Sequence, residues 1–182
     1  MHDRVQTQRE RATLMSLSRL SVLRVGLVLG LGFMMSQTAQ AQAPIPYGEP
    51  ISLETAKKVI AAAEVEANKN KWPVAIAVVD SSGYLVAFQR LENTQLGSIE
   101  VSIKKAKTSA LFRRPTKVFE DMLTTGGANN KVLALPEALP IEGGLPIIVD
   151  GKIVGAIGVS GVKSTEDAQI ATAGLEVLKP KP

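Results

Sequence analysis

The alternation of apolar and polar positions between residues 142 and 161 predicts a β-hairpin. Two apolar runs, Leu145–Val149 and Ile153–Val159, flank the pair Asp150-Gly151. An Asp-Gly pair between two such runs is typical of a tight turn, because both central residues of that turn adopt positive φ. Both runs are apolar on both faces, so both sides of the sheet should be covered. Close approach of another backbone or of a ligand is indicated by Gly155, Gly158 and Gly161.

The remaining pattern predicts helices over 52–71 and 98–112, and a last helix that begins near Ser164. Val74–Val79 and Tyr84–Gln89 flank a turn cluster and predict a second hairpin, and Val132–Leu135 is expected to be a short edge strand or part of a loop. This order favours the α+β class, a single antiparallel β-sheet of about five strands flanked by helices. The expected inner stripe of the first helix is Ala56, Val59, Ile60, Ala63 and Ala67, and that of the last helix is Ala168, Ala171, Leu175 and Leu178.

The helix over 98–112 carries two opposed stripes. Ile99, Ile103, Ala106 and Ala110 recur at helical spacing and predict a core face. Val101, Thr108 and Phe112 fall on the opposite face, flanked by Lys104 and Lys105. A second stripe of this kind is either ordinary surface or a face that meets a ligand or another subunit.

Residues 1–41 are predicted to be a signal peptide. Arg19 and Arg24 precede the apolar run Val25–Met35, and Ala39-Gln40-Ala41 matches a cleavage site of small residues. The apolar run is too short to cross a bilayer, which takes about 20 residues, so we expect no stable membrane insertion after cleavage. A periplasmic or secreted protein follows, with an extended lead-in over 42–50 and one domain over 51–182.

Composition excludes several classes of chemistry. The leader holds five of the 21 basic residues and two of the 17 acidic ones, so the mature chain is nearly neutral and its charge gives no argument for nucleic acid. Cysteine is absent, and the one histidine, His2, lies in the leader. The mature chain therefore has no Ser–His or Cys–His catalysis and no zinc site built from those residues. We identify no catalytic residue.

Two stretches remain as candidate binding sites. Between Lys104 and Lys117 the chain has six basic residues and no acidic one. Such a run is a solvated helix face or an anion site, in which Arg113 and Arg114 would offer bidentate geometry. The second stretch, Glu142-Gly143-Gly144, is either a plain loop into the strand or the rim of a pocket.

Several motifs together resemble the GlcG/HbpS family of haem-binding proteins. They are EGGLPIIVDGKIVGAIGVSG followed by STEDAQIATAG, the earlier hairpin VAIAVVDSSGYLVAFQRLE, and the helix end KKAKTSALFRRPT. The match covers almost the whole mature chain in order. The resemblance implies a small α/β domain that assembles into homo-oligomers, and it implies haem as the cofactor. A haem-degrading role is attributed to parts of the family.

The family resemblance also suggests where haem would bind. A threonine hydroxyl, which is a weak iron ligand, is thought to serve an exported haem binder of the family. Thr108 and Thr116 both lie in the corresponding segment here, and either would be the ligand. Strong haem ligands are His, Cys, Met and Tyr, of which the mature chain has only Tyr47, Tyr84 and Met122. The propionates would pair with Lys104, Lys105, Arg113 and Arg114.

Three functions are consistent with these features. The first is an exported protein that sequesters, transports or senses haem. The second is an enzyme or accessory protein acting on a small carboxylate such as glycolate, with Arg113, Arg114 and Glu142-Gly143-Gly144 at the site. The third is an oligomeric interaction module whose second helix stripe is buried against another subunit.

Overall fold

The computed structural model describes residues 43–179, so the expected signal peptide lies outside the described residues. The helices are α2 (Leu53–Asn70), α3 (Gly97–Phe112), α4 (Lys117–Thr125) and α5 (Ser164–Leu175). The strands are β1 (Ala75–Asp80), β2 (Leu85–Arg90), β3 (Gly144–Val149) and β4 (Lys152–Ser160), and two 3₁₀ helices are η1 (Gly127–Ala134) and η2 (Glu176–Leu178).

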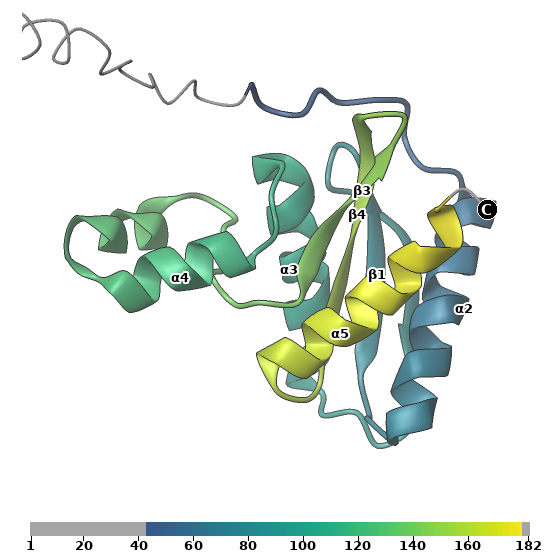
Figure 1. The fold of residues 1–182 in the computed structure, drawn as a ribbon. Coiled ribbons are helices and arrows are strands. Elements are labelled where there is room, and N and C mark those ends of the chain that lie inside the picture. The colour runs from purple at the N-terminus through teal and green to yellow at the C-terminus, as the bar shows by residue number, and fades with distance from the viewer. Residues whose placement is uncertain (1–42, 180–182) are drawn as a thin grey trace, which may run out of the picture. The chain divides into compact units, whose positions relative to one another are not determined.

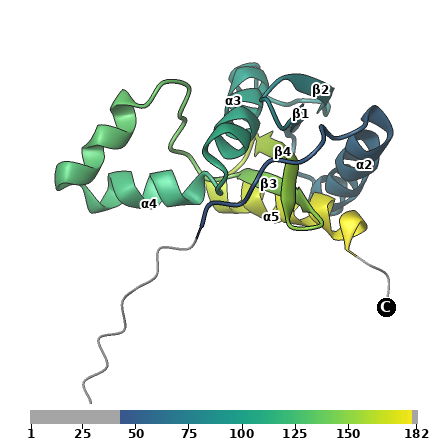
Figure 2. The same cartoon turned by 90° about the horizontal axis from the view of Figure 1, so that it is seen from above.

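The four strands form one antiparallel sheet in the order β2-β1-β4-β3. Helices α2 and α5 cover one face of the sheet, and α3 covers the other (Figure 1, Figure 2). The α+β class with an antiparallel sheet is confirmed. The expected edge strand Val132–Leu135 is wrong, because Gly127–Ala134 forms η1 and the Leu135 N–H closes its last turn on the Val132 carbonyl.

The hairpin of β3 and β4 has its turn at the two residues that the sequence predicts. Asp150 and Gly151 have φ of 48° and 71°, which is the pair of positive values that a type I′ turn needs. Tyr47 in the lead-in forms a bridge with Ile153, so the chain before α2 also contacts this hairpin. β4 lies between β1 and β3, and it is more buried than β3, the other strand of this hairpin.

The two faces of the sheet differ in the size of their side chains. Ile76, Val78, Ile157 and Val159 fill the face below α2 and α5. Opposite α3 the strands carry alanine and glycine, so the helix backbone approaches the sheet closely. A Cβ added to Gly158 would lie 2.1 Å from the Ser102 carbonyl oxygen. The close approach that this glycine indicated is therefore made by the backbone of α3.

The helix stripes are partly as expected. All five residues of the α2 stripe are buried, and Ser52 caps that helix by accepting a hydrogen bond from the Thr55 N–H at 3.2 Å. In the expected α5 stripe, Ala171 is buried and Leu175 and Leu178 pack against the core, whereas Ala168 is wrong, because Ile170, Gly174 and Asp167 are the other buried residues of that helix. On α3, Ile99 and Ile103 are only half-buried, whereas five polar residues are buried, namely Ser98, Ser102, Lys105, Thr108 and Ser109.

The Gly158→Ala variant should lose stability. The added methyl group would push α3 off β4, and overpacking of this kind costs about 1–3 kcal/mol. Urea unfolding followed by circular dichroism measures the loss. Gly97→Ala is the matched control, because no atom lies within 4 Å of its added Cβ, and it should be as stable as the wild type. Equal stability of Gly158→Ala and the wild type would contradict the close packing of α3.

Candidate ligand-binding site

The loop before β3 is tied to the segment between α3 and α4. The Gly144 N–H donates to Thr116 Oγ1 at 2.9 Å, and the Thr116 N–H donates to the Gly144 carbonyl oxygen at 3.0 Å. Thr116 is completely buried, and a Cβ on Gly144 would lie 2.4 Å from the Lys105 carbonyl oxygen. The hydroxyl of Thr116 therefore holds the loop against α3 and is not presented to a ligand.

A buried ion pair joins α3 to α5. Lys105 Nζ lies 2.8 Å from Asp167 Oδ2, and the two side chains are only 1% and 3% exposed. Lys105 Nζ also donates to the Val159 carbonyl oxygen at 2.9 Å, and Asp167 Oδ1 accepts from the Val162 N–H at 3.2 Å. The expected pairing of Lys105 with a propionate is therefore not what the structure shows, because this lysine lies in the interior beside Asp167.

Desolvation dominates the electrostatics of this pair. Burial raises the pKa of Asp167 above the ordinary value for an aspartate, although the attraction and hydrogen bond of Lys105 act in the opposite direction. Gly143 lies directly against the pair with a φ of 121°, and a Cβ there would be 2.8 Å from Lys105 Nζ. The Gly-Gly sequence is thus needed for close packing around the pair and the Thr116 hydroxyl.

Thr108 is covered by the segment after η1. Its Oγ1 donates to the Glu137 carbonyl oxygen at 3.0 Å and accepts from the Leu139 N–H at 2.9 Å. Lys107 Nζ lies 2.9 Å from Glu137 Oε2, and this contact is the main reason why the pKa of Glu137 is lowered. The covering segment is exposed at Leu135, Pro136 and Glu137, so only a thin layer separates Thr108 from solvent.

Aromatic and guanidinium groups gather where α3 ends and α4 begins. The rings of Phe112 and Phe119 meet edge to face with centroids 5.3 Å apart, and the Arg114 guanidinium lies 5.7 Å from the centre of the Phe119 ring. The Arg113 guanidinium lies 5.3 Å from the centre of the Tyr47 ring. The Tyr47 hydroxyl contacts the carbonyl oxygens at the end of α3, at Ala110 and Leu111.

Among the residues predicted for the site, Val101 is half-buried and Lys104 is exposed. Glu142 faces α4, where its N–H donates to Glu120 Oε2, and its own Oε2 is buried without a hydrogen-bond partner. The structure thus brings Phe112, Arg113, Arg114 and Thr116 together at one end of α3. Thr108 lies about one turn before Phe112 on the same helix. Lys105 and Gly143 lie inside, under the loop.

Two contributors were not identified from the sequence, and a third, Tyr47, was considered only as a possible iron ligand. Tyr47 and Phe119 belong to the aromatic group, and Asp167 is the partner of Lys105. Asp167 is the acidic residue of a helix-start motif, Ser164-Thr165-Glu166-Asp167, and this motif explains an acidic residue there without any buried partner. Within residues 43–179 the structure has no cluster of three or more metal-ligating His, Cys, Asp or Glu side chains. The same range contains no helix long and apolar enough to cross a bilayer.

The fold and these contacts define a class of small α+β proteins. In this class a helix lies on an antiparallel sheet, and a loop covers the polar outer face of that helix. The sequence model described as "Haem degrading protein HbpS-like" matches residues 51–176. The chain belongs to this HbpS-like family, which confirms the resemblance noted from the motifs.

Individual relatives share most of the domain. The chain is 42% identical to Protein GlcG of Escherichia coli K12 over 110 residues, which are 60% of this chain and 81% of GlcG. A double mutant of HbpS from Streptomyces reticuli has a similar structure, with a TM-score of 0.68, 30% identity, and coverage of 73% of this chain and 90% of that one. A PduOC:heme complex is also similar, with a TM-score of 0.64, 25% identity, and coverage of 70% and 94%.

The Lys105→Met variant should be less stable at neutral pH and recover part of the loss in acid. Removing one member of a buried pair leaves the other charge uncompensated, which costs roughly 3–5 kcal/mol. Because burial raises the pKa of Asp167, this carboxylate takes up a proton at a higher pH in the folded protein than in the unfolded chain. The stability lost in Lys105→Met therefore becomes smaller as the pH falls through that pKa. Urea unfolding between pH 7 and pH 4 measures the effect.

Two further variants separate a buried pair from a surface pair. Lys58→Met breaks the exposed pair with Glu54 and should have almost no effect. Lys105→Met/Asp167→Leu removes both buried charges and should regain most of the stability lost in Lys105→Met. A double variant as unstable as Lys105→Met would contradict the account of the ion pair.

Proposed function

We propose that this chain binds haem on the outer face of α3, between the covering segment 135–139 and the aromatic group at the end of that helix. The observation that carries the proposal is the similarity to a PduOC:heme complex over almost the whole of that chain. The family description, which names a haem-degrading protein, points in the same direction. Haem-related binding is therefore supported for the family, and its extension to this chain is our proposal.

The charges and rings on this face suit a porphyrin. Phe112 and Val101 would contact the macrocycle, which buries a large apolar area on contact with side chains. Lys104 lies in the middle of α3, and Arg113 and Arg114 follow its last residue; none of the three has an ion pair within the described residues. Arginine and lysine pair well with carboxylates, so these three residues would hold the propionates.

Thr108 is the better candidate for the iron ligand. Both threonines are completely buried, but Thr116 is hydrogen-bonded to Gly144 at the start of β3, whereas Thr108 is hydrogen-bonded to the backbone of Glu137 and Leu139, in a segment with exposed residues. Displacing the exposed covering segment would free the Thr108 hydroxyl without disturbing the sheet. A neutral oxygen is a weak ligand compared with His or Cys, so the proposal is for reversible binding without tight ligation.

The biological role that follows is sequestration, transport or sensing of haem by an exported protein, periplasmic or secreted, after removal of the leader. We also propose a homo-oligomer, which is supported by exposed apolar side chains on the arm formed by α4, η1 and the loop to β3. These side chains are Val118, Leu133, Leu135 and Ile141. The arm projects away from the sheet (Figure 1, Figure 2). A monomer in sedimentation velocity would contradict the oligomer.

The Thr108→Val variant should bind haem about tenfold more weakly than the wild type, because it lacks the oxygen ligand but keeps the shape of the side chain; tenfold corresponds to about 1.4 kcal/mol. Thr108→Ser, which keeps a hydroxyl, should bind like the wild type. Titration of the mature protein with haem, followed by the Soret band, measures the Kd.

Thr116→Val is the matched control at the second threonine. It should bind haem like the wild type but lose about 1–3 kcal/mol of stability, because the Gly144 N–H is left buried without an acceptor. Absence of a Soret shift at micromolar haem would overturn the proposal. Weakened binding in Thr116→Val alone would assign the ligand to that residue instead. Glycolate binding without haem binding would favour the small-carboxylate alternative.

A further inference from the structure

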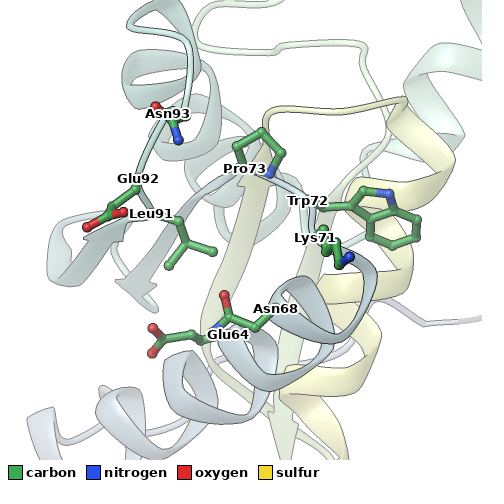
Figure 3. Close-up of a pocket in the computed structure, with 8 residues that line it drawn as sticks. All are labelled: Glu64, Asn68, Lys71, Trp72, Pro73, Leu91, Glu92 and Asn93. Carbon is green, nitrogen blue, oxygen red and sulfur yellow. The ribbon is translucent and has the colours of Figure 1, made fainter.

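A cavity of about 480 Å³ lies between the C-terminal end of α2 and the segment that follows β2 (Figure 3). Its walls come from Glu64 and Asn68 on α2, from Glu92 and Asn93 after β2, and from the turn at Lys71-Trp72-Pro73. None of these residues belongs to the haem site proposed above. The cavity volume is within the usual range for a small-molecule site, roughly 300–1,000 Å³.

The polar side chains of the cavity are not engaged with one another. Within the described residues, the side chains of Glu64, Asn68, Glu92 and Asn93 make no hydrogen bond or ion pair, unlike the neighbouring Glu66, which contacts Asn70 and Gln169. Two carboxylates and two amides thus surround a hollow without a protein partner, and Asn68, Glu92 and Asn93 are exposed to solvent. A ligand that supplies donors would replace solvent at the carboxylates, because a carboxylate only accepts hydrogen bonds.

Apolar groups separate these polar ones. Leu91 extends toward α2, with Glu92 on one side of it and Glu64 and Asn68 on the other (Figure 3). Leu91 and Trp72 are half-buried and pack against the main hydrophobic core. The lining of the cavity is therefore mainly polar, with apolar surface from Leu91 available to the body of a ligand.

The charge of the cavity selects a cation. Glu64 and Glu92 contribute two negative charges against the single positive charge of Lys71. Helix α2 also ends here, with Lys71 as its C-cap residue, and the carbonyl end of a helix favours positive charge. We propose that this cavity binds a small organic ammonium compound, with the ammonium group between Glu64 and Glu92 and an apolar body over Leu91.

Trp72 offers a selective test, because it is the only tryptophan in the chain and it lines the cavity. Three probes with the same phenylethyl body and different charge are 2-phenylethylamine, 2-phenylethanol and 3-phenylpropionate. Titrated into haem-free mature protein, the amine should change Trp72 fluorescence saturably, at lower concentration than the alcohol, and the carboxylate should not bind. The amine should bind more weakly at high salt, since salt screens exposed charges.

Glu64→Gln and Glu92→Gln should each raise the Kd for the amine by about two- to fivefold, as expected for partly exposed charge pairs. Glu54→Gln is the matched control, because it removes a carboxylate from the opposite end of α2, ten residues or about 15 Å from Glu64. Its Kd should equal that of the wild type.

Three results would overturn the cation site. They are no saturable fluorescence change with the amine up to 10 mM, tighter binding of the carboxylate than of the amine, and equal weakening in Glu54→Gln and Glu64→Gln. The Soret titration of the same protein is independent of this test, so failure of the cation site leaves the haem proposal standing, and the reverse also holds.

Discussion

The close approach of α3 to the sheet is the constraint on which the rest of the structure depends. Gly158 has no side chain, so the helix backbone at Ser102 and Ala106 reaches β4. One turn along, Lys105 extends through the interior to Asp167 and ties α3 to α5. The rotation of α3 about its own axis is fixed by these two contacts, since sliding or turning the helix would break the buried pair. The residues of its outer face are fixed by the same contacts.

The function of the outer face of α3 depends on the segments that cover it. Thr108 is bonded to the backbone of the segment after η1, and Phe112 meets Phe119 at the start of α4. Thr116, which lies close in sequence, instead closes the loop before β3. Residues 43–179 contain no His and no Cys, and the threonine hydroxyl on this face is a weak oxygen ligand. We therefore propose reversible haem binding, in which the porphyrin takes the place of the protein segment that covers Thr108.

The periodic parts of the fold follow from the sequence, and the buried polar contacts do not. The stripe of α2 and the turn at Asp150-Gly151 are local patterns, and both occur as predicted. Lys105 lies within a basic run, where exposure is the usual outcome, and its partner is 62 residues away, so no local pattern reveals the pair. The apolar run Val132–Leu135 suits a strand, but it pairs with none of the four strands and ends the 3₁₀ helix η1 instead. Thr108 and Thr116 are equivalent in sequence, and only their hydrogen bonds distinguish them.

The central claim is that haem takes the place of the segment that covers Thr108. The most direct measurement is hydrogen exchange of the Leu139 amide by NMR, because this N–H donates to Thr108 Oγ1. Exchange at Leu139 should become faster when haem saturates the protein, whereas the Gly144 amide, which donates to Thr116, should stay protected. Unchanged protection of Leu139 at full Soret saturation would contradict the claim and place haem elsewhere on the molecule.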